Sequence, residues 1–201
     1  MTKIIAILNH KGGVGKTTTT INLAAALQQK KKRVLAIDMD GQANLTESFG
    51  LSIEEEKTVY GAMKGEYPLP LVKAENGISI VPACLDLSAA ESELINEPGR
   101  ELMRGMAKIT NVIEIVRERL NPNLNIGGIV ITQFDKRKTL NKNVSEIIND
   151  SFCDKVFKTV IRDNVAVAEA PIKGKNIFEY NKSSNGAKDY MSLAQEVLKL
   201  K

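Results

Sequence analysis

Short apolar segments flank one amphipathic segment in the first 40 residues. Residues 3–8, KIIAIL, and residues 33–38, RVLAID, are aliphatic runs bounded by polar residues, and this pattern predicts two buried strands. Between them, KTTTTINLAAALQQKKK predicts a helix. Its inward side chains are expected to be Ile21, Leu23, Ala24 and Leu27. Strand, helix and strand in this order predict a βαβ unit with parallel strands.

Both kinds of segment recur in the rest of the chain. Further strands are predicted at 77–83, 126–132 and 155–161. The last of these alternates between apolar and polar residues, which favours a place near a sheet edge. Further helices are predicted at 104–120, 139–150 and 186–199, with a turn at 121–125. The sequence therefore predicts an α/β fold, doubly wound, with a mostly parallel sheet flanked by helices, in one domain over residues 1–201.

The stretch NHKGGVGKTTTT, from Asn9 to Thr20, lies between the first predicted strand and its helix. A phosphate-binding loop of the usual pattern would need glycine at position 10, where this chain has His10. A strand that runs into a glycine-rich turn and then a helix is nevertheless the context that confirms such a loop. The stretch therefore predicts a site for a nucleoside triphosphate.

Each residue type in this loop suits one part of a bound triphosphate. The backbone cradle is expected to comprise Gly12, Gly13, Val14 and Gly15, because glycines let N–H groups approach phosphate oxygens. Lys16 is expected to contact the β- and γ-phosphates, and the Thr17 hydroxyl to bind Mg²⁺. Thr18 is expected to contact the α-phosphate or to cap the first turn of the helix.

Lys11 is a second lysine in a loop that Lys16 already serves. It is either an ordinary surface lysine or a group that reaches outward to the phosphates of a partner subunit. The motif KGGVGKTT resembles the deviant Walker A motif of ParA-type ATPases, which include Soj-like partition proteins and MinD. In that family the first lysine contacts ATP in trans within a sandwich homodimer. The resemblance implies this role for Lys11, with ATP (and its product ADP) and Mg²⁺ as ligands.

The second predicted strand and its continuation, RVLAIDMDGQANLT, resemble the DxDPQ switch segment of the same family. Asp38 and Asp40 stand at the matching positions, and Gly41 replaces the proline. The resemblance implies that Asp40 is the hydrolytic aspartate, which orients the attacking water or holds Mg²⁺ through water. Without the family, the alternative for the two aspartates is a pair that belongs to a loop and a helix cap.

The charge is unevenly divided along the chain. Residues 1–102 contain 11 Lys and Arg and 13 Asp and Glu, whereas residues 103–201 contain 17 and 11. A basic C-terminal half favours a polyanion such as DNA, although an uneven solvated surface gives the same count. The resemblance extends through this half and implies a non-specific double-stranded DNA surface. Its candidate contacts are Lys136, Arg137, Lys138 and Arg162. Asp163 stands where the family often has arginine in a PRN run.

One segment of the family has no counterpart here. Relatives separate the regions matching EPGREL (97–102) and MRGMAKITNVIEIV (103–116) by a helix, the Walker B strand, a helix and another strand. The sequence therefore predicts an internal deletion near 102/103. Either the printed sequence joins two segments of a longer polypeptide, or the polypeptide is truly shorter. A real deletion is expected to impair hydrolysis.

Composition narrows the remaining function classes. The two cysteines, Cys84 and Cys153, form no metal or cluster pattern, and no apolar run predicts a signal peptide or membrane span. The leading hypothesis is a ParA-type ATPase that is cytoplasmic and nucleoid-associated, acts in plasmid or chromosome partition and is stimulated by a centromere-binding ParB-type protein, with no membrane partner. The alternatives are a MinD-like membrane-associated positioning ATPase and a nucleotide-binding protein with impaired hydrolysis. The ending SLAQEVLKLK predicts a packed helix rather than a membrane tail.

Overall fold

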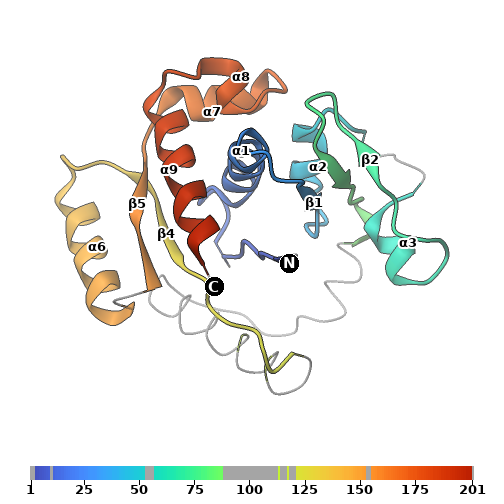
Figure 1. Ribbon diagram of the computed structural model, residues 1–201, viewed down its shortest axis with the longest axis horizontal. Coiled ribbons are helices and arrows are strands. Elements are labelled where there is room, and N and C mark those ends of the chain that lie inside the picture. Colours follow the sequence, from blue (N-terminus) through green and yellow to red (C-terminus); the bar gives the residue numbers. More distant parts are fainter. Residues whose placement is uncertain are drawn as a thin grey trace.

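The computed structural model describes residues 3–9, 11–52, 57–87, 113, 117, 121–152 and 155–200, with the backbone alone over 139–144. Its elements, labelled as in Figure 1, are α1 (Lys16–Gln29), β1 (Leu35–Ile37), α2 (Asn44–Ser48), α3 (Val59–Met63), β2 (Val72–Lys73), β3 (Ser79–Val81), β4 (Ile129–Phe134), α6 (Thr139–Phe152), β5 (Val156–Arg162), α7 (Val165–Ile172), α8 (Ile177–Asn181) and α9 (Asn185–Lys199).

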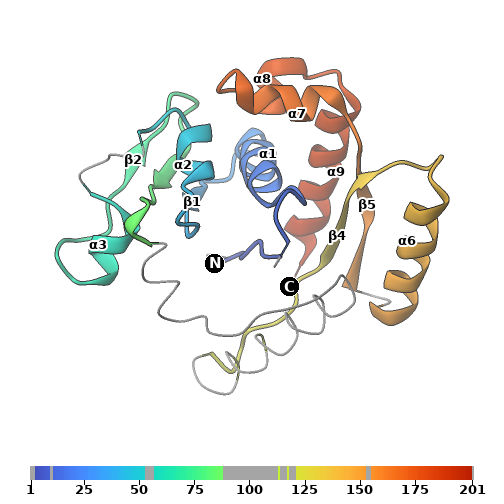
Figure 2. The ribbon, with the colours of Figure 1, turned by 180° about the vertical axis from the view of Figure 1, so that it is seen from behind.

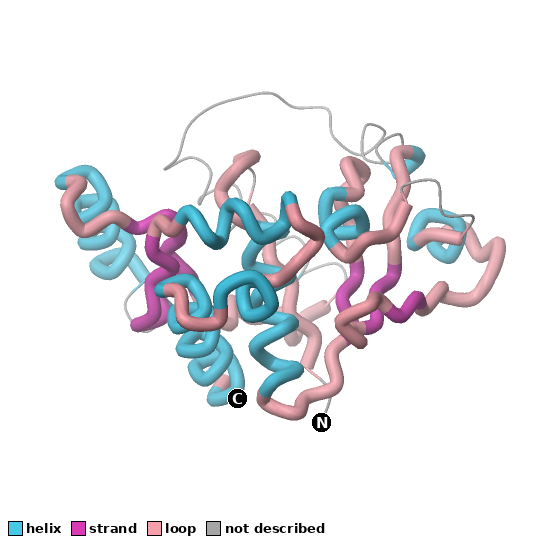
Figure 3. The backbone as a smooth tube through the Cα atoms, turned by 90° about the horizontal axis from the view of Figure 1, so that it is seen from above, coloured by secondary structure: helices cyan, strands magenta, loops and turns pink. Residues whose placement is uncertain are grey.

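The described strands form two separate sheets. In the first, β1 pairs in parallel with β3, and β2 pairs with the other edge of β3 in antiparallel orientation. In the second, β4 and β5 pair in parallel, with register shifts along the pair. Figure 3 shows the two groups of strands on opposite sides of the molecule, with helices and loops between them. The parallel α/β architecture is as predicted, but its sheet is divided.

Helix α1 lies between the two sheets (Figures 1 and 2) and supplies side chains to a core on each side. Leu23 and Ala26 belong to a cluster with buried residues of β5, α7, α8 and α9. Ile21, Ala24 and Ala25 belong to a second cluster with residues of β1, α2 and β3. The run INLAAA is therefore apolar around most of the helix because both faces are buried. Leu27, predicted to point inward, packs half-buried against the first cluster.

The prediction of a buried strand at 3–8 is wrong. Residues 3–9 have no strand structure, and the side chain of Ile4 is 97% exposed. An apolar run becomes a strand only where neighbouring strands take up its backbone hydrogen bonds, and neither described sheet extends to this segment. The divided sheet explains the failure, since the segment passes between the two sheets without a ladder partner (Figures 1 and 2).

The other predicted elements agree with the structure, with shifted ends, except that β1 is not a fully buried strand: Ala36 is buried, whereas Leu35 and Ile37 are 45% and 44% exposed. Strand β4 begins three residues after the predicted start at 126, behind two consecutive glycines. Among the described strands β5 pairs only with β4, which confirms its expected place near an edge. A hydrogen bond of 3.0 Å from the Leu124 N–H to the Asn121 carbonyl closes the predicted turn. The helix predicted over 104–120 lies outside the described residues, except for Ile113 and Arg117, which are helical.

Candidate nucleotide-binding site

The glycine-rich loop leads into α1 through two residues with left-handed backbone. Gly13 has φ of 70° and Gly15 has φ of 89°, a conformation that costs little only for glycine. Gly15 is the N-cap of α1, and no side chain caps that helix end. The first N–H groups of α1 therefore lack an intrahelical partner and present a positive helix end beside the loop. This is the local geometry of an anion-binding loop.

The two lysines of the loop differ in their surroundings. The Lys16 ammonium donates a hydrogen bond of 3.2 Å to the Lys11 carbonyl, so it lies over the loop itself. The Lys11 backbone N–H donates to the side chain of Asn9, and the Lys11 side chain is exposed. Thr17 and Thr18, in the first turn of α1, are half-buried. Lys16 is thus placed for an anion in its own loop, whereas Lys11 faces outward.

Asp38, at the end of β1, is a buried anchor. Its side chain is 2% exposed, and its carboxylate accepts hydrogen bonds from the Thr46 hydroxyl (2.7 Å), the Thr46 N–H (2.9 Å) and the Asp40 N–H (3.1 Å). The Thr46 hydroxyl in turn accepts from the N–H of Ala83, just beyond β3. Asp38 therefore fixes the start of the switch segment to the first sheet.

Asp40 differs from Asp38 in its exposure. It is half-buried, and its carboxylate accepts a hydrogen bond of 3.0 Å from the N–H of Gln42. Its carbonyl accepts from the N–H of Ala43, which closes a tight turn around the buried Gly41. Of the two aspartates, Asp40 is the one that reaches solvent, as a residue that acts on water or on a hydrated metal ion must.

Two residues of β4 also touch the loop, and sequence reasoning missed both. The Thr132 hydroxyl donates to the Val14 carbonyl at 2.8 Å, and the Gln133 side-chain amide donates to the Gly13 carbonyl at 2.9 Å. No sequence signal marks these residues, because the contacts join positions about 120 residues apart. They become visible only when β4 is placed beside the loop.

Comparison with known proteins shows which family the chain belongs to. The model of the CobQ/CobB/MinD/ParA nucleotide binding domain matches residues 5–177. The chain belongs to this family. Soj of Thermus thermophilus, a chromosome-partitioning ATPase, is 37% identical over 96% of this chain and 94% of its own. The sporulation initiation inhibitor Soj of Bacillus subtilis is 33% identical over 98% of each chain.

Solved structures agree with the family. Cobyrinic acid a,c-diamide synthase of Mycobacterium smegmatis, with bound ADP and magnesium, matches 98% of this chain and 94% of its own with a TM-score of 0.79 and 25% identity. MinD of Pyrococcus horikoshii, complexed with Mg-ADP, matches 100% and 97% with a TM-score of 0.75 and 24% identity, which shows a shared fold. The fold prediction, a P-loop α/β domain of the ParA/MinD type, is confirmed.

The alignment with the ParA/MinD relatives is longer than the chain. It runs over 249 positions for the Bacillus Soj, against 201 residues here, so at least 48 positions (249 less 201) have no residue in this chain. Because the aligned region includes 98% of the chain, most of these positions lie inside it rather than beyond its ends.

The four basic residues expected on a ParA-type DNA surface are differently engaged. Arg137 donates to the Asp135 carboxylate at 2.9 Å, and this side-chain hydrogen bond is the main cause that lowers the pKa of Asp135 to about 2. The Lys138 ammonium lies 4.0 Å from the carboxylate of Asp163, and Lys136 is exposed. These three lysine and arginine side chains lie together at the end of β4.

Arg162, at the end of β5 and in register with Phe134 of β4, differs from the other three in its partner, a carboxylate of α9. Its guanidinium donates to Asp189 on α9, with 2.9 Å from Nε to Oδ2. The side chain of Asp189 is 10% exposed and that of Arg162 is 44% exposed. The guanidinium is thus committed to an internal contact, which the sequence alone did not indicate.

Helix α9 packs its apolar face into the core, as predicted for the C-terminal segment. Leu193, Ala194 and Val197 are all buried in the same cluster as Leu23 of α1. In the part of the chain that the structure describes, no helix has the length and apolar character needed to cross a membrane. The face of α9 that a lipid-binding helix would use is therefore already occupied by protein.

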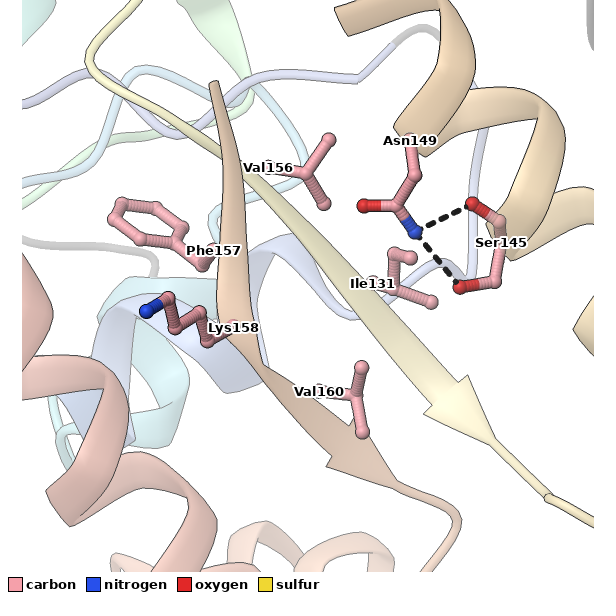
Figure 4. Close-up of a pocket in the computed structure, with 7 residues that line it drawn as sticks. All are labelled: Ile131, Ser145, Asn149, Val156, Phe157, Lys158 and Val160. Atoms are coloured by element: carbon pink, nitrogen blue, oxygen red, sulfur yellow. Dashed lines mark hydrogen bonds between the residues drawn. The ribbon is translucent and has the colours of Figure 1, made fainter. Parts of the chain in front are cut away.

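A cavity of about 490 Å³ lies between α6 and the β4–β5 sheet. Figure 4 shows Asn149 and Ser145 of α6, joined by hydrogen bonds, opposite Ile131 of β4 and the valines of β5. Lys158 supplies the only charge among its described lining residues. None of its lining residues belongs to the glycine-rich loop, so this cavity is separate from the nucleotide site.

Proposed function

We propose that the protein is a ParA-type ATPase that binds ATP with Mg²⁺, closes into a nucleotide sandwich homodimer and binds DNA without sequence preference. The observation that carries the proposal is the loop with two lysines in different positions. Lys16 lies over its own loop, whereas Lys11 is exposed at the loop's start. In each site, Lys16 of the same subunit contacts the phosphates, and Lys11 of the second subunit contacts them from across the dimer interface.

The donor set of the site fits Mg²⁺ bound together with a nucleotide. Such an ion takes one or two protein oxygens and completes its shell with phosphate oxygens and water. The Thr17 hydroxyl and, through water, the Asp40 carboxylate supply oxygens of the right chemistry. Bound magnesium would neutralise charge on the β- and γ-phosphates. The Lys16 ammonium and the backbone N–H groups of residues 12–15 hold the phosphates.

Hydrolysis needs a positioned water more than a strong base. Asp40 is the residue we assign to that water, because its carboxylate meets solvent while Asp38 is buried and fully bonded. Asp40→Ala is then expected to bind ATP and to turn it over slowly. Asp38 acts indirectly, because it fixes the N–H of Asp40 and so the start of the turn.

A second candidate is a nucleotide-binding protein with impaired hydrolysis. Two observations favour it: at least 48 aligned positions of the Bacillus Soj have no residue here, and the sheet is divided beside the loop. We place the deletion near 102/103, where the relatives' Walker B strand would stand. Loss of that strand removes a second carboxylate for Mg²⁺. A MinD-like membrane role finds no support in α9, whose apolar face is buried.

The cellular role follows the ParA-type relatives. We infer that the ATP-bound dimer coats nucleoid DNA in the cytoplasm and moves a plasmid or chromosome, with turnover stimulated by a ParB-type centromere-binding protein. Support comes from the Soj relatives and from the excess of positive charge in residues 103–201. Lys136, Arg137 and Lys138 form the candidate DNA cluster at the end of β4.

Calorimetric titration with Mg·ATP, followed by sedimentation, tests this proposal. Lys16→Ala should abolish binding, whereas Lys11→Ala should bind Mg·ATP in the monomer and fail to dimerise with it. ATP turnover with and without DNA then separates the two candidates, since the impaired form binds and does not hydrolyse. Unchanged ATP affinity in Lys16→Ala would overturn the site, and normal dimerisation of Lys11→Ala would overturn its trans role.

A further inference from the structure

The two β4 contacts meet the phosphate loop on consecutive carbonyls. Thr132 donates to the oxygen of Val14 and Gln133 to the oxygen of Gly13, at 2.8 and 2.9 Å. A β-carbon added to Gly15 would lie 4.0 Å from that of Thr132, so β4 also packs directly against the loop. These contacts fix two neighbouring peptide planes in the middle of the loop.

The direction of the two carbonyls decides where the loop's N–H groups point. In a trans peptide the C=O and the N–H of the same plane point in opposite directions. The Gly13 carbonyl shares its plane with the N–H of Val14, and the Val14 carbonyl shares its plane with the N–H of Gly15. Donors that hold both carbonyls toward β4 therefore aim both N–H groups away from β4, as a phosphate nest requires.

The backbone of β4 departs from a regular strand to make these contacts. Gln133 has φ of 53°, a left-handed conformation that is rare for a residue with a long side chain. The β4–β5 register also shifts on both sides of Ile131. Without this irregularity, alternation would send Thr132 and Gln133 to opposite faces of the strand. Strained backbone that brings two consecutive side chains onto one loop is typical of a functional site.

We propose that Thr132 and Gln133 are positioning residues for the phosphate loop: they hold the Gly13 and Val14 carbonyls so that the loop binds the phosphates of a nucleotide without first reordering. The inference rests on the proposed nucleotide binding and adds to it two residues that lie 118 and 120 positions from their partners in the loop. It assigns to β4 a role in ligand affinity rather than in stability alone.

Titration with Mg·ADP, together with thermal melts of the same samples, tests the inference. Thr132→Val keeps the shape and removes the donor, and Thr132→Ser restores the donor. We expect Thr132→Val to bind Mg·ADP about three- to tenfold more weakly, the ratio that one neutral hydrogen bond is worth, and Thr132→Ser to bind as wild type does. Asp189→Asn, whose side chain bonds Arg162 of β5 and no loop residue within the part of the chain that the structure describes, controls for loss of stability.

Gln133→Gly is an independent test, because stability and affinity are expected to change in opposite directions. Glycine accepts the left-handed backbone, so the melting temperature should stay equal or rise, while Mg·ADP affinity falls about three- to tenfold. If both variants bind as tightly as wild type, or lose affinity only as much as the Asp189→Asn control does, the positioning role is wrong and the proposed function stands. If wild type itself fails to bind Mg·ADP, the proposed function fails and this inference fails with it.

Discussion

Arg162 and Asp189 tie the end of β5 to the C-terminal helix α9 by side chain and backbone together. The Asp189 carboxylate accepts from the Arg162 guanidinium at 2.9 Å and from the Arg162 backbone N–H at 3.1 Å. The hydrogen bond to Asp189 raises the pKa of Arg162 above its ordinary value. Arg162, which the family resemblance offers as a DNA contact, therefore also links two elements of the fold.

Asp189→Asn is expected to lower stability without changing DNA affinity. The amide keeps the shape but loses the charge that satisfies the Arg162 N–H groups, which should cost about 1–2 kcal/mol of unfolding free energy. For a chain of this size each kcal/mol lowers the melting temperature by about 2–4 °C. Thermal melts measure the loss, and DNA titration well below the melting temperature measures affinity. A clear change in DNA affinity, in either direction, with unchanged stability would return Arg162 to the DNA surface.

Asp163→Asn is expected to strengthen DNA binding. Asp163 lies 4.0 Å from the Lys138 ammonium, and both side chains are about 60% exposed. An exposed pair of this kind adds little stability, but its carboxylate repels a DNA phosphate beside Lys138. Affinity for a random duplex, measured by fluorescence anisotropy, should rise about two- to fivefold at low salt and less at high salt. Glu66→Gln, which removes an exposed carboxylate paired to Lys64, is the matched control. An equal gain in DNA affinity there would show that the effect comes from net charge and not from the position of Asp163.

Glu196→Gln is expected to weaken the fold at neutral pH and not in acid. Burial raises the pKa of Glu196, but hydrogen bonds from the Thr159 hydroxyl and the N–H groups of Lys158 and Thr159 outweigh it, so the pKa lies below 4.5. A lowered folded-state pKa gives stability that is present above pH 4.5 and is lost as pH falls through the folded value. At pH 7 the variant should lose about 1 kcal/mol.

Melts across pH 3–7 measure this difference. The gap between wild type and Glu196→Gln should close below about pH 4.5. Glu146→Gln, on the exposed face of α6, serves as the control and should give no gap at any pH. A gap that persists unchanged in acid would show that the glutamine fails for steric reasons rather than through lost charge.

Asn22→Ala is expected to be among the more destabilising changes in α1. Asn22 is 1% exposed; its amide donates to the Thr18 carbonyl at 2.9 Å and accepts from the Ile177 N–H at 2.7 Å. Alanine leaves that buried N–H without a partner, which should cost about 1–3 kcal/mol. Chemical denaturation measures the loss. Asn149→Ala removes the same amide from an exposed position at the rim of the α6 cavity and should stay within about 0.5 kcal/mol of wild type.

Local patterns in the sequence were sufficient for the loop, α1, β1, β3, β5 and α9. Each of these depends on periodicity or on a motif whose residues are neighbours in the chain. The strand prediction for 3–8 is wrong because a strand needs neighbouring strands to take up its backbone hydrogen bonds, and the exposed Ile4 shows that no such strand among the described residues covers this segment. The Thr132 contact to Val14 and the Arg162 contact to Asp189 depend on the packing of distant elements, so no local pattern contains them. The short helices α2, α3 and α8 have five residues each, too few for a periodic signal.

The position of α1 between the two cores has a consequence for how the protein unfolds. Neither sheet keeps a complete core if this helix leaves, because Leu23 and Ala26 fill one cluster while Ile21, Ala24 and Ala25 fill the other. The two halves are therefore expected to melt in a single cooperative transition despite the break between their sheets. A ligand held at the start of α1 would add its binding free energy to that one transition, so that nucleotide protects both halves from amide hydrogen exchange alike.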